Sequence, residues 1–401
     1  MIATLDRLGR AGALIACLLV TAATLYLVLG LVNSLSWDGP GWAPENGQPI
    51  GRDFVAFWAA GRLALDGDAA AAYDLAAIQA VEAAVAQHDV NTVPWHYPPT
   101  FLLIVLPLAA LPYPVAVLVW LVAPAAVLML LYRRFAGVSA AVPMALIFPA
   151  TAQCLISGQN GIAFTAVLLA ALSWLERRPV LAGLAISLFA CKPQLAPLLL
   201  PALLFGRCWR TLGAAVAGGT VLVAASWLAF GWDAWRAFLE QIPAAGAMLI
   251  DGAKPWARMP TIFAAARIMG LESHVAWLAQ GLVALSVAGI VAWIWGEASD
   301  PRIRGAVLAA AIPMATPFLF DYDLVLWLIP LAWLTAEAAA RSWPAWDRAV
   351  LVVGWLGSVG GWLVAWKIGL PAMAAAGLIL LGAVLLRLLG QRPSAAGRLA
   401  G

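Results

Sequence analysis

The residues of this sequence whose types and spacing could do chemistry begin in the stretch Gly51–Arg62, GRDFVAFWAAGR. There Asp53 stands beside Arg52, directly ahead of an aromatic run and within a strongly apolar chain. A carboxylate near hydrocarbon costs roughly 2.5–3.5 kcal/mol at a helix centre, so acidic residues that persist there usually line a polar cavity, a substrate pathway or a catalytic site. The sequence therefore predicts a functional role for Asp53.

Further polar residues interrupt the apolar runs that follow. Lys192-Pro193-Gln194 lies between two short apolar stretches. We expect these to be two short helices, one that leads from Arg178 up to this tripeptide as its apex and one that leads back down to Arg207. An ammonium group near the membrane boundary is suited to a phosphate head group. Other polar residues fall at what we predict to be the outer ends of spans: His96, Gln159, Asn160, Asp321 and Asp323. We therefore expect one polar site on the outer face.

The composition requires that these residues be carried by membrane helices. The chain has 401 residues, of which 64% are hydrophobic and 11% charged, and its mean hydropathy is +0.91. Soluble domains carry about 25% charged residues, and many apolar runs here approach the roughly 20 residues that cross a bilayer. We predict an all-α polytopic membrane protein with a single domain over residues 1–401.

Several other classes of site are not indicated. The net charge is only +3 and no basic patch predicts nucleic-acid binding. The four cysteines have no CxxC spacing, so neither a zinc site nor a disulfide framework is expected. We predict no metal and no cofactor.

Basic residues set the expected orientation. Arg7 and Arg10 precede an apolar run over 11–32, which we interpret as an uncleaved first span with its basic flank inside. Later arginines sort to the same side if the short run 101–111 does not cross. This predicts about 12 spans with both ends inside, in the inner membrane of a bacterium, and puts residues 34–97 on the periplasmic side.

Two outer segments, 34–97 and 231–273, are expected to form interfacial elements. Apolar and aromatic residues recur at helical spacing over 53–65, which predicts an amphipathic helix on the membrane surface. Asp74 is a predicted N-cap of a second helix, ending near Gln87. The tryptophans of 232–258 predict a belt that faces the membrane.

Four blocks of residues carry a resemblance to a known family and together span most of residues 51–330. The blocks are Asp53–Arg62 with Tyr73-Asp74; Tyr97-Pro98-Pro99 with Pro107 and Leu111-Pro112-Tyr113; Gly158-Gln159-Asn160-Gly161 with Glu176-Arg177-Arg178-Pro179 and Lys192-Pro193-Gln194; and Thr316-Pro317 with Asp321-Tyr322-Asp323. In this order and spacing the chain resembles glycosyltransferase family 87. Those enzymes have the membrane C-type fold, depend on polyprenyl-phosphate sugars and include α-mannosyltransferases.

The resemblance implies a metal-independent, inverting transfer of a sugar from a lipid-linked phosphate to an acceptor hydroxyl on the outer side. The family's catalytic carboxylate matches Asp53, and the chemistry agrees, since a base must take the acceptor proton and cations must stabilise the departing phosphate. The phosphate-side candidates are Lys192, Arg52, Arg62 and His96. The substrate-side candidates are Gln159, Asn160, Gln194, Asp321, Tyr322 and Asp323.

Simpler explanations stay open at this point. Asp53 could be a helix N-cap, and Lys192 could extend toward water as a membrane anchor. Asp321 and Asp323 could cap a helix starting near Leu324, and Gln159-Asn160 could be only a tight turn. At the level of function, the alternatives are a secondary transporter and a lipid flippase or non-catalytic polymer-assembly protein. Nothing in the sequence identifies the sugar, for which mannose or another hexose is expected, or the lipid or glycan acceptor.

Overall fold

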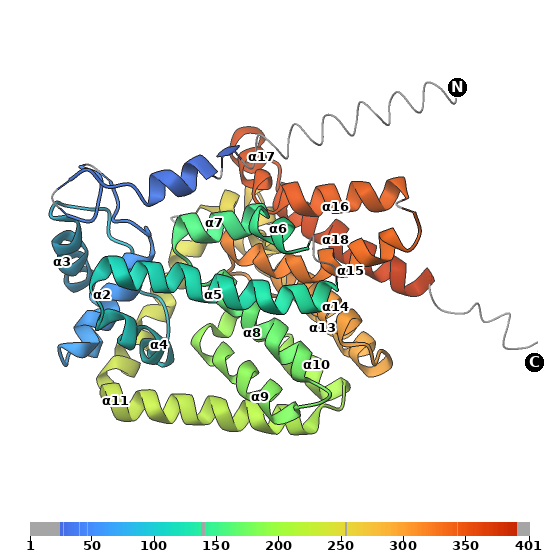
Figure 1. Cartoon of the computed structure of the whole chain (residues 1–401), viewed down its shortest axis with the longest axis horizontal. Coiled ribbons are helices and arrows are strands. Elements are labelled where there is room, and N and C mark those ends of the chain that lie inside the picture. The colour runs from blue at the N-terminus through green and yellow to red at the C-terminus, as the bar shows by residue number, and fades with distance from the viewer. Residues whose placement is uncertain are drawn as a thin grey trace, which may run out of the picture.

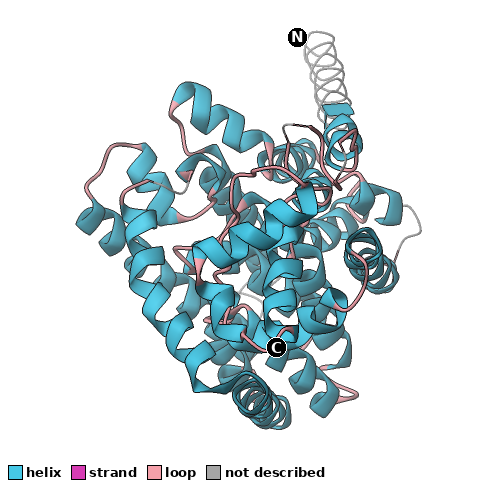
Figure 2. Ribbon diagram, turned by 90° about the vertical axis from the view of Figure 1, so that its left-hand side faces the viewer, coloured by secondary structure: helices cyan, strands magenta, loops and turns pink. Residues whose placement is uncertain are grey.

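The computed structural model describes residues 25–390 except residues 27, 40, 46, 138–140, 253, 254 and 343. All regular structure in this part is helical, as Figure 2 shows, so the predicted all-α class is confirmed. Most of the predicted first span over 11–32 lies outside the described residues, and so do Arg7 and Arg10.

Five helical segments in the described part are long and apolar enough to cross a membrane. They are α5 (Tyr113–Ala136), α11 (Trp209–Ile250), α13 (Ser273–Glu297), η5 with α15 (Asp321–Ala339) and α18 (Ala372–Gly390). A sixth is formed if α16 (Ala345–Gly357) and α17 (Gly360–Ile368), which are bent by 73°, count as one span. Several apolar helices therefore indicate a multi-pass membrane protein, but the expected number of about 12 spans is not confirmed.

The other helices of the apolar part are short. They are α4 (Pro99–Ala109), α6 (Ala141–Leu146), α7 (Pro149–Ser157), α8 (Gly161–Trp174), α9 (Pro179–Ser187), α10 (Leu199–Phe205), α12 (Ile262–Ile268) and α14 (Pro301–Ala315). The run predicted not to cross became α4, whose 11 residues rise about 16 Å, half of the hydrocarbon thickness. Beyond α9, η2 (Leu188–Cys191) and η3 (Pro193–Leu195) form the predicted apex around Lys192.

The first outer segment folds into α2 (Phe54–Leu65), η1 (Ala69–Tyr73) and α3 (Leu75–Ala86). Asp74 accepts a hydrogen bond from the Ala77 amide at 2.9 Å, so the predicted N-cap is confirmed. The expectation of an amphipathic surface helix over 53–65 is wrong, because α2 is buried on most of its circumference. It packs closely on α4, where a Cβ on Gly61 would lie 2.6 Å from the Ala109 Cβ.

The second outer segment was expected to begin at residue 231, and the helix α11 (Trp209–Ile250) is interrupted at that residue. α11 consists of two helical parts, which meet at Gly231, where the backbone is not helical. The kink is at Gly231, whose φ of 74° is readily adopted only by glycine. Figure 1 shows α11 running below α9 and then turning up toward α2 and α4. The chain then reaches the short helix η4 (Trp256–Arg258).

Glu82 of α3 is a buried carboxyl in the first outer segment. Its two oxygens accept from the same Val93 amide, at 3.1 and 3.3 Å, and its side chain is fully buried. Burial raises the pKa of Glu82 to about 7; the Val93 hydrogen bond opposes this rise and the charge of Asp53 adds to it.

Glu82→Gln is expected to stabilise the protein above neutral pH. The raised folded-state pKa means that stability is fully present below the unfolded pKa of about 4.3 and is lost as the pH rises through about 7. At 1.36 kcal/mol per pKa unit, the gain from glutamine should be about 2 kcal/mol larger at pH 8 than at pH 5. Thermal unfolding at the two pH values measures it. The exposed Glu45→Gln is the control, and an equal gain at both pH values would contradict the assignment.

Candidate active site

The centre of the candidate site is the turn Gly158–Gly161, which joins α7 to α8. Its two middle side chains reach in different directions. Gln159 Nε2 donates to Asp53 Oδ2 at 2.9 Å, while Asn160 Oδ1 accepts from Lys192 Nζ at 2.6 Å. The turn therefore connects the carboxylate of the first outer segment to the cation at the apex after α9.

Both glycines of this turn are required by close backbone approach. A Cβ on Gly158, which has φ of 63°, would lie 1.9 Å from the Gly51 carbonyl oxygen. A Cβ on Gly161 would lie 2.2 Å from the Tyr322 carbonyl oxygen. The turn is thus held between the segment that precedes Asp53 and the first turn of η5. Gln159-Asn160 is therefore more than a connection between two helices.

Gly161→Ala is expected to separate α8 from η5 and to weaken the site. Overpacking of a close contact costs about 1–3 kcal/mol, and here the opposing atom is backbone. We expect a lower melting temperature and slower turnover in the same variant. Gly213→Ala on α11, where nothing lies within 4 Å of the added Cβ, should be neutral or slightly stabilising. Equal behaviour of the two variants would show that the close approach has no consequence.

Lys192 forms a buried ion pair at the inner side of the site. Its Nζ lies 2.5 Å from Asp323 Oδ1, and the two side chains are only 2% and 3% exposed. The ammonium also lies over the rings of Phe164 and Tyr322, at 5.7 and 5.6 Å from their centroids. Lys192 is therefore not an anchor extended toward water, because its charged end is enclosed by protein.

A second ion pair joins Arg258 to Asp321. The guanidinium binds the carboxylate through two hydrogen bonds, Nε to Oδ2 at 2.9 Å and Nη2 to Oδ1 at 2.8 Å. Asp321 is fully buried, whereas the Arg258 side chain is 33% exposed. Asp321 Oδ1 also accepts from the Tyr322 amide at 2.8 Å, so it satisfies one backbone donor in the first turn of η5 in addition to binding Arg258. Asp323 instead binds Lys192.

Sequence reasoning missed Arg258, because the segment around it was interpreted as a tryptophan belt facing the membrane. One signal was present. No carboxylate lies between Asp251 and Glu272, so a partner for this arginine had to come from elsewhere in the chain. The sequence alone does not say from where.

Asp53 lies at the partly exposed edge of the cluster. Its amide donates to the Ser157 carbonyl at 3.1 Å, and its side chain makes no cap bond to α2, so the N-cap explanation is wrong. Burial raises the pKa of Asp53, whereas the Gln159 hydrogen bond and the charges of Arg258 and Arg52 lower it. The net upward shift makes this carboxylate a stronger proton acceptor than an aspartate in water.

The remaining predicted residues lie at different distances from this cluster. Tyr97, next to the partly exposed His96, donates from its hydroxyl to Gln159 Oε1 at 3.2 Å. Arg62 pairs with Asp66, which directly follows the last residue of α2, at 3.0 Å, and this pair does not include Asp53. Gln194 is partly buried in η3 and makes no side-chain hydrogen bond to the described residues of the cluster.

The described residues contain no group of three or more histidine, cysteine or acidic side chains arranged to hold a metal ion. What they do contain is two cations, Lys192 and Arg258, each fixed by a buried aspartate of η5, with a third, partly exposed carboxylate, Asp53. Such an arrangement can stabilise a developing negative charge next to a proton acceptor.

Comparison with known proteins identifies the family of the chain. The model of glycosyltransferase family 87 matches residues 95–317, which contain the central turn, Lys192 and Arg258 but neither Asp53 nor Asp321 and Asp323. No curated protein and no solved structure matches the chain. Because the family match extends over more than half of the sequence, the chain belongs to glycosyltransferase family 87.

Proposed function

We propose that this glycosyltransferase moves a sugar from a polyprenyl-phosphate-linked donor to an acceptor hydroxyl by a single inverting displacement, with Asp53 as the general base. The observation that carries the proposal is the Asp53 carboxylate, held by Gln159 at a partly exposed position beside Arg258. A base in such a position can meet an incoming hydroxyl, while Arg258 and Lys192 supply positive charge within the same cluster.

The chemistry of the displacement fits these groups. The acceptor oxygen forms the new bond to the anomeric carbon as the bond from that carbon to the phosphate oxygen breaks, and its electron pair leaves with the phosphate. The acceptor proton goes to Asp53. General-base catalysis of this kind contributes roughly 10²–10⁴-fold, and fixed cations stabilise the charge of the leaving phosphate without having to reorganise.

Among the cations, we assign the donor phosphate to Arg258 and Lys192. Arg258 is partly exposed and keeps donors free of Asp321, since a guanidinium has five. Lys192 is enclosed and already has two oxygen partners, so its charge acts from inside the site. Arg52, His96 and Arg62 remain weaker proposals for the same role.

For the sugar, we assign hydroxyl contacts to Gln159, Asn160 and Gln194, with Tyr322 as a neighbouring surface. Asp321 and Asp323 orient the two cations. Mannose or another hexose is the proposed sugar, and a lipid or glycan the proposed acceptor. The protein would work as a C-type enzyme of about 12 spans in a bacterial inner membrane, with its site facing the periplasm.

Orientation is tested by cysteine labelling. With the native cysteines replaced, we expect Asp89→Cys, at an exposed position after α3, to react with an impermeant maleimide added from outside. Arg177→Cys, exposed in the turn between α8 and α9, should react only after permeabilisation, because arginines concentrate on the inner side. The opposite pattern would reverse the orientation.

The function itself is tested with purified protein and a panel of polyprenyl-phosphate sugars carrying mannose, glucose or arabinose. Release of polyprenyl phosphate together with a glycosylated acceptor supports the proposal. Movement of a lipid-linked sugar across vesicles without transfer would indicate a flippase, and uptake of a free solute would indicate a transporter.

A further inference from the structure

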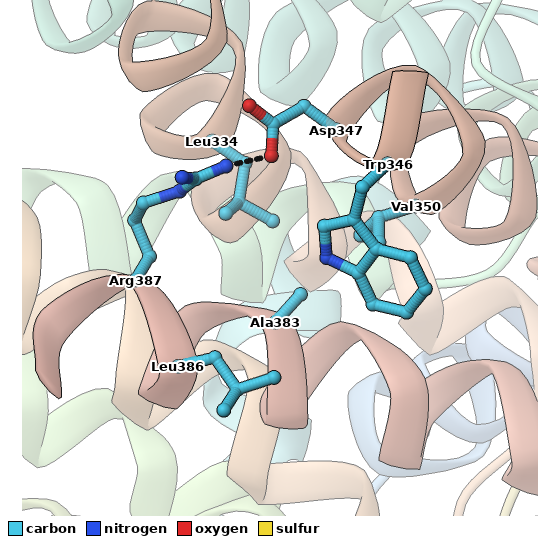
Figure 3. Close-up of a pocket in the computed structure, with 7 residues that line it drawn as sticks. All are labelled: Leu334, Trp346, Asp347, Val350, Ala383, Leu386 and Arg387. Carbon is cyan, nitrogen blue, oxygen red and sulfur yellow. Dashed lines mark ion pairs between the residues drawn. The ribbon is translucent and has the colours of Figure 1, made fainter. Parts of the chain in front are cut away.

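A second polar site lies at the opposite end of α15 from Asp321 and Asp323. Here α15 ends, α16 begins and α18 ends, and the three helices enclose a cavity of about 120 Å³ (Figure 3). This volume exceeds several-fold the roughly 10–15 Å³ that one water requires. Most of the wall is apolar and consists of Leu334, Val350, Ala383 and Leu386.

The polar part of the wall is an ion pair with one unused oxygen. Asp347, in the first turn of α16, pairs through Oδ1 with Arg387 in the last turn of α18 (Figure 3). Asp347 is only 6% exposed, and its Oδ2 is buried without a hydrogen-bond partner among the described residues. A buried acceptor without a donor is costly and rare. The unpaired Asp347 Oδ2 therefore indicates a ligand that supplies a hydrogen-bond donor. Because the acceptor is a carboxylate, a positively charged donor is favoured.

The arginine of this ion pair can also bind a ligand. Arg387 is 21% exposed and has five donors, of which the pair with Asp347 uses only part. Arg341, just past the end of α15, interacts electrostatically with Arg387 and is itself paired with Glu337 at 2.9 Å. A phosphate could therefore bind Arg387 while Asp347 remains in place.

The surroundings indicate that this ligand is a membrane lipid. The candidate spans Asp321–Ala339 and Ala372–Gly390 both end here, so the cavity lies at the level of lipid head groups. Trp346 is 59% exposed and Leu386 63% exposed at its rim, and tryptophan is enriched where membrane meets water. An apolar rim of this kind suits acyl chains, which a free phosphate compound lacks.

We propose that this cavity binds a phospholipid whose head group carries both a phosphate and a primary ammonium, as in phosphatidylethanolamine. The phosphate would contact Arg387 and the ammonium would donate to Asp347 Oδ2, with the upper acyl chains on Trp346 and Leu386. A choline head group cannot donate this hydrogen bond, and a glycerol head group brings no cation to Asp347. The site should therefore discriminate among lipids that share the same acyl chains.

Native mass spectrometry of the full chain in detergent tests this with phosphatidylethanolamine, phosphatidylcholine and phosphatidylglycerol of identical acyl composition. We expect the ethanolamine lipid to bind about tenfold more tightly than the choline lipid. Asp347→Asn should abolish that preference, and Arg387→Gln should weaken retention of all three lipids. Arg236→Gln, which removes an exposed ion pair on α11, is the matched control and should change nothing.

A second variant keeps the test decisive if Asp347→Asn fails to fold. Val350→Trp fills the cavity from α16 without touching either charge, and it should remove the ethanolamine preference while the Asp347–Arg387 pair remains. Equal binding of ethanolamine and choline lipids by the unmodified protein would overturn the proposal, and so would a preference that survives both Asp347→Asn and Val350→Trp. Tight binding of water-soluble phosphoethanolamine, which has no acyl chains, would instead identify a site for a free solute and reject the lipid.

Discussion

Asp53→Asn is expected to slow sugar transfer by roughly 10²–10⁴-fold, the usual contribution of a general base. Asparagine keeps the size of the side chain, and its carbonyl oxygen can still accept the hydrogen bond that Gln159 donates to Asp53. Because Asp53 makes no cap bond to α2, the fold should not depend on its charge. Turnover of purified protein measures the loss, and binding of the donor lipid should persist.

Two further variants and a pH profile make this prediction specific. Asp53→Glu should recover little, because a displacement of about 1 Å can cost roughly 10²-fold. Asp74→Asn, at an exposed cap of the same outer segment, should keep full activity, since the two residues cap equally well. The raised pKa of Asp53 predicts that kcat/KM falls, as the pH is lowered, at a pH above the ordinary aspartate value of about 3.9. This fall of kcat/KM at low pH should be absent in Asp53→Asn.

Near-normal turnover of the asparagine variant would contradict the assignment of Asp53. The search for the base would then move to Asp321 and Asp323, the other two carboxylates of the cluster. Both are buried and paired with cations, so neither meets an incoming hydroxyl as directly as Asp53 does. This difference in exposure is the reason for ranking Asp53 first.

Lys192→Met is expected to have the second large effect, on stability and activity together. Removing the ammonium leaves the Asp323 carboxylate buried without a counter-charge, and breaking a buried pair from one side costs about 3–5 kcal/mol. Loss of the Lys192 positive charge near the donor phosphate would weaken donor use by about 1–3 kcal/mol more. Lys192→Arg should rescue only partly, because the guanidinium has a different shape. Lys367→Met on α17 is the control.

The double variant Lys192→Met/Asp323→Leu separates the two contributions. Replacing a buried ion pair with apolar residues of similar volume is often neutral or stabilising, so thermal unfolding should return close to that of the unmodified protein. Sugar transfer should nevertheless stay low, because the positive charge that acts on the donor phosphate from inside the site is gone. If transfer recovered together with stability, Lys192 would be a structural residue and Arg258 would remain as the cation for the phosphate.

Several local features could be predicted because they depend on residues close in sequence. The apolar composition determines the membrane class, and Asp74 caps α3 because its acceptor and the Ala77 amide are three residues apart. The apex at Lys192-Pro193-Gln194 follows from short apolar runs on both sides of it. Gly158 and Gly161 indicated a tight turn, although the backbone segments that pack against these glycines could not be deduced.

The prediction for α2 failed because its apolar pattern has two interpretations. In a membrane protein, the spacing of aromatic residues over α2 does not distinguish a face toward lipid from a face toward protein, since both are apolar. Packing against α4 decided that α2 is buried. At Gly231, by contrast, the expected interruption of the helix is present, because a φ of 74° is readily adopted only by glycine.

The sequence by itself determined the class of the protein and the identities of most residues that gather at the site. Only the tertiary structure decided their partners: Gln159 is 106 residues from Asp53, Lys192 is 131 residues from Asp323 and Arg258 is 63 residues from Asp321. Charges in an apolar interior must be paired, so the sequence requires that partners exist. Which residues pair depends on how α7, α8 and η5 pack together, and that is a property of the whole fold.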